Sequence, residues 1–350
     1  MNTVSLGNVS VGEGDPPYIV AEVGSNHNGD MDLCRQLIDA AADAGAHAVK
    51  FQSWSESSLI AREEYDRNPE YSDKKKHFGS LREMVRAYQL TPQQHREAWD
   101  HCQSRGIAFC SSAFSPGEAD LLDELDVPFI KLASMDITNL PLVAHVAAKQ
   151  RPVVISTGMA DLAEIEQAVQ TVRAQGNEQI ILLHCISIYP PDPATIHLRN
   201  MATLREAFGV PVGFSDHSLG TSIPLAAIAL GACFIEKHFT LDKGMAGWDH
   251  AISADPEEMR TIVHEGRAVF EALGSARRSV SEAELQKRRQ FRRSLVAREP
   301  LPAGHILTEH DVDAKRPGTG IAPDELRYVV GRRLASDVVE DQVIRWEDLK

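Results

Sequence analysis

Eight short apolar runs dominate the first 240 residues of the chain, each bounded by polar residues, glycine or proline. They lie at 18–24, 48–52, 107–114, 129–134, 153–158, 180–185, 210–215 and 233–240. Continuous apolar runs of this length are typical of parallel strands that are covered on both faces. The segments between them have helical periodicity, as in 31–45 and 161–176, both of which end in glycine. The pattern predicts a (β/α)8 TIM barrel, with a doubly wound parallel sheet as the alternative.

A change of composition near residue 275 predicts a second, smaller domain. Residues 276–293 are charged and helical in pattern, whereas 294–350 contain short β-like runs with Pro and Gly. We therefore expect a barrel over 1–275, a linker helix over 276–293 and a mostly-β domain over 294–350. The long connection after the second run, which includes 63–79, predicts a lid or a binding loop.

Charge and cysteine content limit the classes of function. The 350 residues carry a formal net charge of -14, which argues against binding to nucleic acid or to an anionic membrane. The first 18 residues show neither a basic start nor an apolar core, and no run reaches a membrane-spanning length, so we expect a cytoplasmic protein. Five scattered cysteines without a Cys-x-x-Cys pair fit reduced thiols.

Polar side chains stand at the end of nearly every apolar run. In a barrel, the carboxyl ends of the strands and the loops that follow them form the catalytic face. Side chains two positions apart share one face of a strand. Three such pairs stand at strand ends: Lys50 with Gln52, Ser215 with His217, and Glu236 with His238. We expect these side chains to meet at the mouth of the barrel.

The histidines at the ends of the last two runs suggest a metal site. Neighbouring strands lie about 5 Å apart, so His217 and His238 could both coordinate one ion at about 2 Å. A two-histidine site leaves positions open for water and for a substrate oxygen, as a Lewis-acid metal requires. Two unrelated, hydrogen-bonded core histidines are the alternative interpretation.

Two lysines inside apolar runs suggest an anion pocket. Lys50 and Lys131 are unusual because buried lysines are rare unless they are paired. A cationic pocket for a phosphorylated or carboxylated substrate is one hypothesis. A structural ion pair with Glu22 or Glu236, or a lysine that forms a Schiff base, are the others. Hydroxyl donors for the same anion stand at three strand ends, Ser134, Ser156 and Ser215.

Three loops carry weaker signals. The segment SNHNGD (25–30) suits an Asx-rich turn before a helix cap, so we assign a function only to Asn26 and to the preceding Glu22. The segment KRPGTG (315–320) also suits a turn, but a rigid Pro-Gly loop could present Arg316 to a ligand. Asp249 could add a carboxylate to the rim. The residues alone thus predict a barrel enzyme with an anion pocket beside a two-histidine metal site.

The motifs, taken in order, resemble those of the sialic acid synthase family, the bacterial synthases of N-acetylneuraminate and other nonulosonates. They are AEVGSNHNGD (21–30), AVKFQ (48–52), KLASMDITN (131–139), STGMA (156–160), HCISIYP (184–190), GFSDHS (213–218), EKHFT (236–240) and KRPGTG (315–320). The resemblance covers nearly the whole chain. Residues 294–350 resemble the antifreeze-like (SAF, β-clip) domain of this family.

The resemblance implies a metal-dependent condensation. C3 of phosphoenolpyruvate would join the aldehyde carbon of an open-chain N-acetylmannosamine-type sugar, water would add at C2, and phosphate would leave by C–O cleavage. The product would be a nine-carbon 3-deoxy-2-keto acid. A 2,4-diacetamido-6-deoxy sugar, leading to legionaminate or pseudaminate, is an alternative acceptor. Further alternatives are a synthase acting on a phosphorylated sugar, a Schiff-base aldolase and a non-catalytic sugar-binding protein.

Roles follow from the family positions. Phosphoenolpyruvate would be held by Lys50, Lys131, Ser134, Ser156 and Ser215. The sugar would face Gln52, Asp136, Tyr189, Asp249 and Arg316. His217 and His238 would bind Mn²⁺, with Mg²⁺ or Co²⁺ as other candidates, and Glu22 and Glu236 would handle water and protons. The family also implies a domain-swapped homodimer, in which Arg316 reaches the active site of the other subunit.

The sequence departs from the family pattern on the side expected to face the sugar. Ser134-Met135-Asp136 stands where N-acetylneuraminate synthases usually have Ser-Gly-Glu, and Ser187 replaces an asparagine. The segment KGMAGWDHAIS (243–253) replaces a loop richer in proline. These changes leave the identity of the sugar open.

Overall fold

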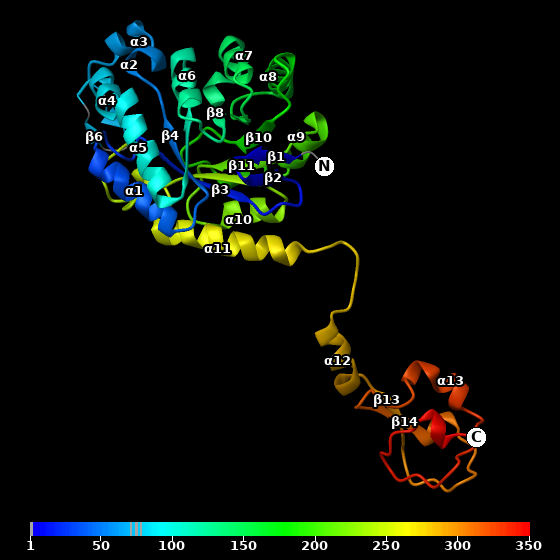
Figure 1. Ribbon diagram of the computed structural model, residues 1–350. Helices are drawn as coiled ribbons and strands as arrows, with labels where there is room; N and C mark the ends of the chain where they lie inside the picture. The colour runs from blue at the N-terminus through cyan, green and yellow to red at the C-terminus, as the bar shows by residue number, and fades with distance from the viewer. Residues whose placement is uncertain (1–2, 71, 74–75, 78) are drawn as a thin grey trace. The chain divides into compact units, whose positions relative to one another are not determined.

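The computed structural model describes residues 3–70, 72–73, 76–77 and 79–350. The chain divides into two compact units, Met1–Gly274 and Ser275–Lys350. Figure 1 shows the first unit as strands enclosed by helices and the second as a smaller unit with few regular elements.

Eight parallel strands close into a barrel in the first unit. They are β3 (Tyr18–Gly24), β4 (Ala48–Gln52), β7 (Ala108–Ser112), β8 (Ile130–Leu132), β9 (Val153–Ser156), β10 (Ile180–Cys185), β11 (Val212–Asp216) and β12 (Phe234–His238). The strands follow one another around the barrel in chain order, and β12 pairs with β3 to close it. Each strand overlaps one of the eight apolar runs. The predicted (β/α)8 barrel is therefore confirmed, and a doubly wound sheet is excluded because the sheet has no open edge.

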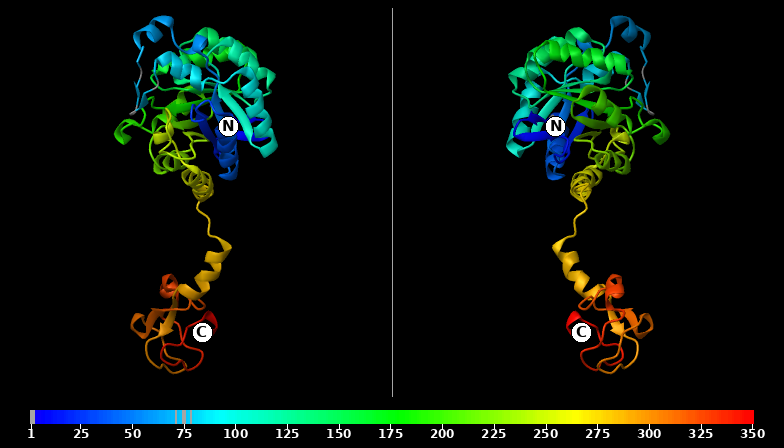
Figure 2. Two further views of the ribbon diagram at one scale, coloured as in Figure 1. Left: turned by 90° about the vertical axis from the view of Figure 1, so that its left-hand side faces the viewer. Right: turned by 90° about the vertical axis from the view of Figure 1, so that its right-hand side faces the viewer.

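Helices surround the strands, as the two side views in Figure 2 show. The principal ones are α1 (Met31–Asp43), α5 (Pro92–Arg105), α6 (Pro116–Glu124), α7 (Leu140–Ala148), α8 (Leu162–Ala174), α9 (Asn200–Phe208), α10 (Ser222–Ala229) and α11 (Pro256–Leu273). Helix α1 illustrates why they form. The Asp30 carboxylate accepts the first free N–H groups of the helix, and Cys34, Leu37, Ile38 and Ala41 form its buried stripe.

The connection from β4 to α5 folds into elements of its own beside the mouth of the barrel. These are α2 (Glu56–Leu59), α3 (Arg62–Arg67), the antiparallel pair β5 (Ser72–Asp73) and β6 (Lys76–His77), and α4 (Leu81–Tyr88). A separate apolar cluster contains Trp54, Tyr65, Leu81, Met84, Val85 and Tyr88. The predicted lid over 63–79 falls in this connection, and its residues 71, 74, 75 and 78 lie outside the described residues.

A hairpin that the sequence analysis did not predict closes the opposite end of the barrel. Strands β1 (Thr3–Leu6) and β2 (Val9–Gly12) pair in antiparallel fashion. Their buried side chains Val4, Leu6 and Val11 belong to one cluster with Tyr18, Phe129 and Phe234, which stand where barrel strands begin. This apolar plug leaves the carboxyl ends of the strands as the polar end.

The second unit has its own small core. Its elements are α12 (Glu282–Phe291), β13 (Ser294–Ala297), β14 (Val312–Lys315) and α13 (Leu326–Val329). Strands β13 and β14 pair in antiparallel fashion, and isolated antiparallel pairings such as Leu301 with Val338 join extended segments. Leu295, Leu307, Ile321, Val329 and Ile344 are among the residues buried between them. This agrees with the predicted small β-type domain.

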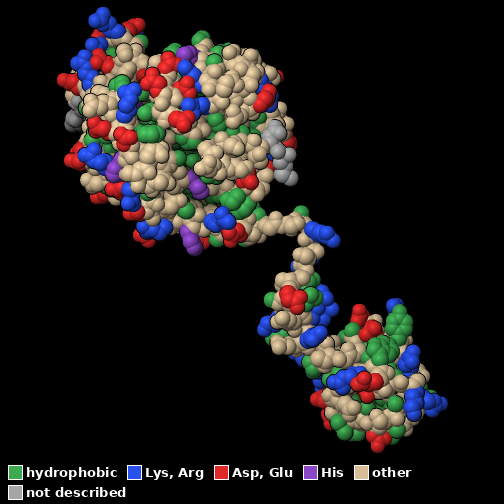
Figure 3. Space-filling model, viewed as in Figure 1, with side chains coloured by type: hydrophobic (Ala, Val, Ile, Leu, Met, Phe, Trp, Pro, Cys, Tyr) green, Lys and Arg blue, Asp and Glu red, His purple; other side chains and the backbone are tan. Residues whose placement is uncertain are grey.

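The surface of the first unit mixes the two signs of charge. Figure 3 shows Asp and Glu side chains interspersed with Lys and Arg on its visible face. Among the described residues, no helix is both long enough and apolar enough to cross a membrane. All five cysteines are buried with free thiols.

Candidate active site

A cavity of about 300 Å³ opens at the carboxyl ends of the barrel strands. It brings together most of the residues selected from the sequence: Glu22, Lys50, Gln52, Lys131, Ser134, Ser156, Tyr189, Ser215, His217, Glu236 and His238. These residues come from different strands that are far apart in the sequence. They meet because all the strands are parallel and end at the same face.

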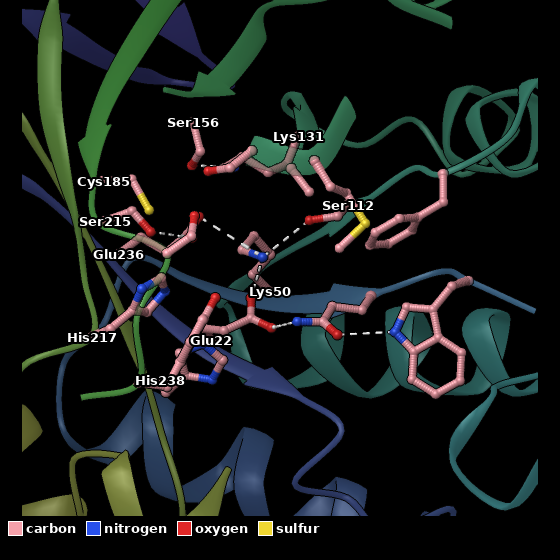
Figure 4. Close-up of a pocket in the computed structure, with 18 of the residues that line it drawn as sticks. Glu22, Lys50, Ser112, Lys131, Ser156, Cys185, Ser215, His217, Glu236 and His238 are labelled. Atoms are coloured by element: carbon pink, nitrogen blue, oxygen red, sulfur yellow. Dashed lines mark hydrogen bonds and ion pairs between the residues drawn. The ribbon is translucent and has the colours of Figure 1, made fainter. Parts of the chain in front are cut away.

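Lys50 lies at the centre of the cavity floor. The register of β3 and β4 sets it opposite Glu22, with which it forms a buried ion pair. Its Nζ also donates a hydrogen bond to Ser112 Oγ (3.1 Å) and lies 3.8 Å from Glu236 Oε2, as Figure 4 shows. Burial lowers the pKa of Lys50, but the two carboxylates outweigh burial and the net pKa is raised. The positive charge of Lys50 is thus already balanced by carboxylates of the protein.

The two buried carboxyl groups have different pKa values. Burial raises the pKa of Glu22 to about 7, although the Lys50 charge opposes the shift. Burial also acts to raise the pKa of Glu236, but the positive charges of Lys50 and Lys131 outweigh it and the pKa is lowered. The Ser215 hydroxyl, which donates to Glu236 Oε1 at 2.9 Å, acts in the same direction. A carboxyl that gains a proton near neutrality beside one that stays ionised is an arrangement suited to acid–base chemistry.

Lys131 has neutral hydrogen-bond partners. Its Nζ donates to Ser156 Oγ (2.6 Å) and to the carbonyl oxygen of Leu132 (2.8 Å). Among the described residues, no carboxylate oxygen forms an ion pair within 4 Å of this ammonium group, and Lys131 as a residue is 2% exposed. Burial lowers the pKa of Lys131, and the more distant Glu236 only partly opposes this shift. An anionic ligand would supply the missing counter-charge.

The two histidines provide nitrogen donors at one side of the cavity. The ring centroids of His217 and His238 are 5.4 Å apart, and Tyr189 stacks on His217 at 3.9 Å. His217 Nδ1 donates to the carbonyl oxygen of Ile186 (2.8 Å), so in the neutral ring Nε2 carries the lone pair that a ligand can use. His238 Nδ1 is buried without a hydrogen-bond partner among the described residues and lies 4.0 Å from Asp249 Oδ2.

This donor set fits a divalent ion whose remaining ligands are oxygens of water or substrate. Within the part of the chain that the structure describes, no group of three or more His, Cys, Asp and Glu side chains is arranged to hold a metal. Two imidazole nitrogens with open positions are nevertheless compatible with a Lewis-acid site.

A buried ion pair that the sequence analysis missed lies behind the histidines. Lys237 Nζ donates to Asp216 Oδ2 and to the carbonyl oxygen of Ser218, both at 2.6 Å. The other Asp216 oxygen accepts the N–H of Ser218 at 2.8 Å. Both residues are 1% exposed and alternate in sequence with the cavity-facing residues of β11 and β12. The ion pair thus joins β11 to β12 on the face of the strands that points away from the His217 side chain. The available signal was a charged residue directly after one apolar run and another inside the next run.

Several further residues line the cavity without having been selected from the sequence. They are Trp54, Leu59, Ser112, Phe114, Ala133, Met135, Met159, Cys185, Ser187 and Trp248. Trp54 Nε1 donates to Gln52 Oε1 (2.9 Å), and Gln52 Nε2 donates to Glu22 Oε1 (3.2 Å). Trp54 therefore orients the Gln52 amide. Ser112 and Cys185 each end a barrel strand, so the strand-end rule could have found them.

Four of the selected residues, Asn26 among them, are not among those that line the cavity. Asp136 is buried beside it, where its Oδ1 accepts a hydrogen bond from Asn139 (3.3 Å), and burial raises its pKa. Asp249 lies beside His238. Arg316 belongs to the second unit, where its guanidinium group lies 4.6 Å from the ring centroid of Phe291.

Comparison with known proteins identifies the family. The NeuB family model matches residues 37–278, and the SAF domain model matches residues 292–350. The chain is 40% identical over 343 residues to the N,N'-diacetyllegionaminic acid synthase of Legionella pneumophila, covering 95% of this chain and 94% of that protein. The synthase of the same name from Campylobacter jejuni is 38% identical over 333 residues, covering 93% and 98%.

A solved structure agrees with these matches. The N-acetylneuraminic acid synthetase of Leptospira borgpetersenii is 32% identical and superimposes with a TM-score of 0.73, covering 82% of this chain and 95% of that one. The chain therefore belongs to the NeuB family of phosphoenolpyruvate-dependent condensing synthases and carries a C-terminal SAF domain.

Proposed function

We propose that this enzyme condenses phosphoenolpyruvate with the open-chain form of an N-acetylated amino sugar to give a nine-carbon 3-deoxy-2-keto acid. The observation that carries the proposal is Lys131, a buried cation with neutral partners in the same cavity as the Glu22–Glu236 pair. C3 of phosphoenolpyruvate forms the new bond to the aldehyde carbon. Water adds at C2, and phosphate leaves with the C–O bond electrons.

The residues divide between the two substrates. Lys131 and Lys50, with the hydroxyl groups of Ser134, Ser156 and Ser215, bind the anion. Glu22, which takes up a proton near neutrality, protonates the sugar oxygen that becomes an alkoxide, and Glu236 accepts the proton from water. Holding both reactants at one strand-end face removes much of the entropic cost of a bimolecular step.

His217 and His238 would hold a divalent ion, with Mn²⁺ as the first candidate and Mg²⁺ or Co²⁺ as others. Bound there, such an ion would polarise the aldehyde oxygen of the sugar. The buried Nδ1 of His238 and the available Nε2 of His217 support this assignment.

We propose a 2,4-diacetamido-6-deoxy sugar as the acceptor. Two relatives at 40% and 38% identity are N,N'-diacetyllegionaminic acid synthases. The outer wall of the cavity is apolar, which suits the methyl groups of a second acetamide and of a 6-deoxy carbon; it includes Leu59, Phe114, Met135, Met159 and Trp248. Among the described residues that line the cavity, Lys50 and Lys131 are the only Lys or Arg side chains. Both are assigned to phosphoenolpyruvate, so no other Lys or Arg side chain among these lining residues is left to bind the phosphate group of a phosphorylated acceptor.

N-acetylmannosamine is the second candidate acceptor. The similarity to the Leptospira N-acetylneuraminic acid synthetase favours it.

Phosphate release from phosphoenolpyruvate tests the reaction and the acceptor together. With Mn²⁺ present, we expect release that depends on one sugar in a panel of N-acetylmannosamine, its 6-phosphate and 2,4-diacetamido-6-deoxy hexoses. We expect EDTA to abolish the release and added Mn²⁺ to restore it. Release with N-acetylmannosamine alone would overturn the choice of acceptor. No release with any sugar, from a folded and Mn²⁺-loaded enzyme, would overturn the reaction.

We further propose that the enzyme is a cytoplasmic homodimer in which Arg316 of one copy serves the active site of the other. Arg316 is exposed on a short Pro-Gly loop of the SAF unit, which suits a residue that contacts another molecule. The five free, buried cysteines fit a reducing compartment.

Complementation between two inactive variants tests the role of Arg316 in trans. We expect Arg316→Ala and Lys131→Met each to be inactive alone. When the two are co-expressed with different tags, about a quarter of the wild-type activity should return, because half of randomly formed symmetric dimers carry one intact site. Tandem-purified mixed dimers without activity would show that Arg316 does not act across the dimer.

A further inference from the structure

The loop after β12 brings two side chains to the active site. Trp248 lines the cavity, and Asp249 Oδ2 lies 4.0 Å from His238 Nδ1. Within residues 239–255, all of which the structure describes, the regular structure is limited to the isolated bridge Phe239–Ala254 and the single turn η3 (His250–Ile252). Side-chain contacts therefore hold much of the loop, and several of them come from outside it.

Residues 25–30, called the SNHN segment below, follow β3 and make one set of these contacts. Asn28 Nδ2 donates to the carbonyl oxygen of Ala246 (2.8 Å), and Asn28 Oδ1 lies 3.3 Å from His250 Nε2. The other ring nitrogen of His250 lies 2.6 Å from Thr240 Oγ1, at the beginning of the same loop. Asn28 thus joins two points of the loop on either side of Trp248.

Asn26 makes a second set at the base of the loop. Its fully buried Nδ2 donates to the carbonyl oxygen of Phe239 (2.9 Å) and to Ser253 Oγ (2.8 Å). Ser253 Oγ in turn donates to the carbonyl oxygen of Asp249 (2.7 Å). One amide therefore links both ends of the loop and reaches the backbone of Asp249.

Glycines allow the segments to approach closely. A Cβ at Gly247 would stand 2.6 Å from Asn28 Oδ1 and would also overlap the His250 ring. Gly29 has a φ of +77° and faces the carbonyl oxygen of Ala87 in α4, where a Cβ would not fit. The SNHN segment is thus packed between the loop after β12 and the β4–α5 connection.

We propose that Asn26 and Asn28 are positioning residues that hold Trp248 and Asp249 at the acceptor end of the cavity. The assignment of that end to the sugar rests on the function proposed above. Asparagine suits position 28 because its amide both donates and accepts and because it tolerates the left-handed φ of 51° found there. The segment therefore does more than form a turn before α1.

The test is Asn28→Gly, which keeps the left-handed backbone accessible and removes only the side chain. His197→Gly is the matched control, since His197 is exposed, has a φ of 50° and does not line the cavity. His250→Ala removes one of the two Asn28 contacts, the one between Asn28 Oδ1 and His250 Nε2, from the side of the other loop. Two readouts are measured: the steady-state constants for both substrates, and the rate of tryptic cleavage at Lys243, which lies within the loop.

For Asn28→Gly we expect KM for the sugar to rise about tenfold, as the loss of two hydrogen bonds predicts, with KM for phosphoenolpyruvate and Tm close to wild type. Cleavage at Lys243 should accelerate severalfold. His250→Ala should produce smaller changes in the same direction, because it removes one of the two hydrogen bonds, and His197→Gly should produce neither. Unchanged cleavage and sugar KM, or an equal change in KM for both substrates, would overturn the proposal. Cleavage does not depend on turnover, so it reports on the loop even if the proposed reaction is wrong.

Discussion

Lys131→Met is expected to lower kcat/KM for phosphoenolpyruvate by at least about 30-fold without lowering the stability of the barrel. Lys131 is buried, and its direct partners are a hydroxyl and a backbone carbonyl rather than a carboxylate. Removing a buried charge that contacts a ligand anion typically costs about 2–5 kcal/mol, which corresponds to a fall in kcat/KM of roughly 30-fold to several thousandfold. The folded apo-enzyme loses an unmatched buried cation, so thermal unfolding should occur at the same temperature or higher.

Lys50→Met is the matched comparison, because both lysines lie on the floor of one cavity. Lys50 is paired with Glu22, so its removal leaves a buried carboxylate without its cation and should lower Tm as well as activity. Phosphate release and thermal unfolding are measured for both variants. Loss of activity without loss of stability indicates a lysine whose counter-charge is the substrate, as expected for Lys131. Loss of both indicates a lysine whose counter-charge is a protein carboxylate, as expected for Lys50. A Lys131→Met enzyme that retains kcat/KM for phosphoenolpyruvate within about tenfold of wild type would contradict the assignment.

Lys237→Met is expected to have the largest effect on stability. It leaves the Asp216 carboxylate, whose side chain is 0% exposed, without its partner. Breaking a buried pair from one side costs about 3–5 kcal/mol, which for a unit of this size lowers Tm by roughly 10 °C. Urea unfolding followed by far-UV circular dichroism measures the change.

The double variant Asp216→Asn/Lys237→Met separates charge burial from packing. It removes both charges, while the side-chain amide oxygen introduced at position 216 can still accept the N–H of Ser218, so we expect it to recover most of the lost stability. Arg67→Met, which breaks an exposed ion pair with Glu63, is the control and should change little. A Lys237→Met variant as stable as wild type would contradict a stabilising role for the Asp216–Lys237 pair.

The sequence was sufficient for the architecture and for much of the site. Eight apolar runs became eight barrel strands because a strand covered on both faces must be apolar along its whole length. The polar residues that end those runs then had to meet, since parallel strands in a closed barrel end at one face. Lys50, Lys131, His217 and His238 were found in this way.

Loop residues were harder to place from the sequence. Asp136 and Asp249 follow barrel strands, as the lining residues do, yet neither lines the cavity. The direction of a loop side chain is set by contacts with other loops, such as the hydrogen bonds from Asn26 and Asn28. The hairpin β1–β2 was missed for a related reason, because its short strands gain their burial from the distant Phe129 and Phe234.

What the sequence determined by itself is thus the periodicity: which segments are strands, which are helices, and which polar side chains stand at strand ends. The tertiary structure decided the pairing of charges. Lys50 is matched by Glu22, Lys237 by Asp216, and Lys131 has no carboxylate within 4 Å among the described residues. Periodicity is a local property of the chain, whereas the partner of a buried charge depends on strand register and on side chains that only folding brings within a few ångströms.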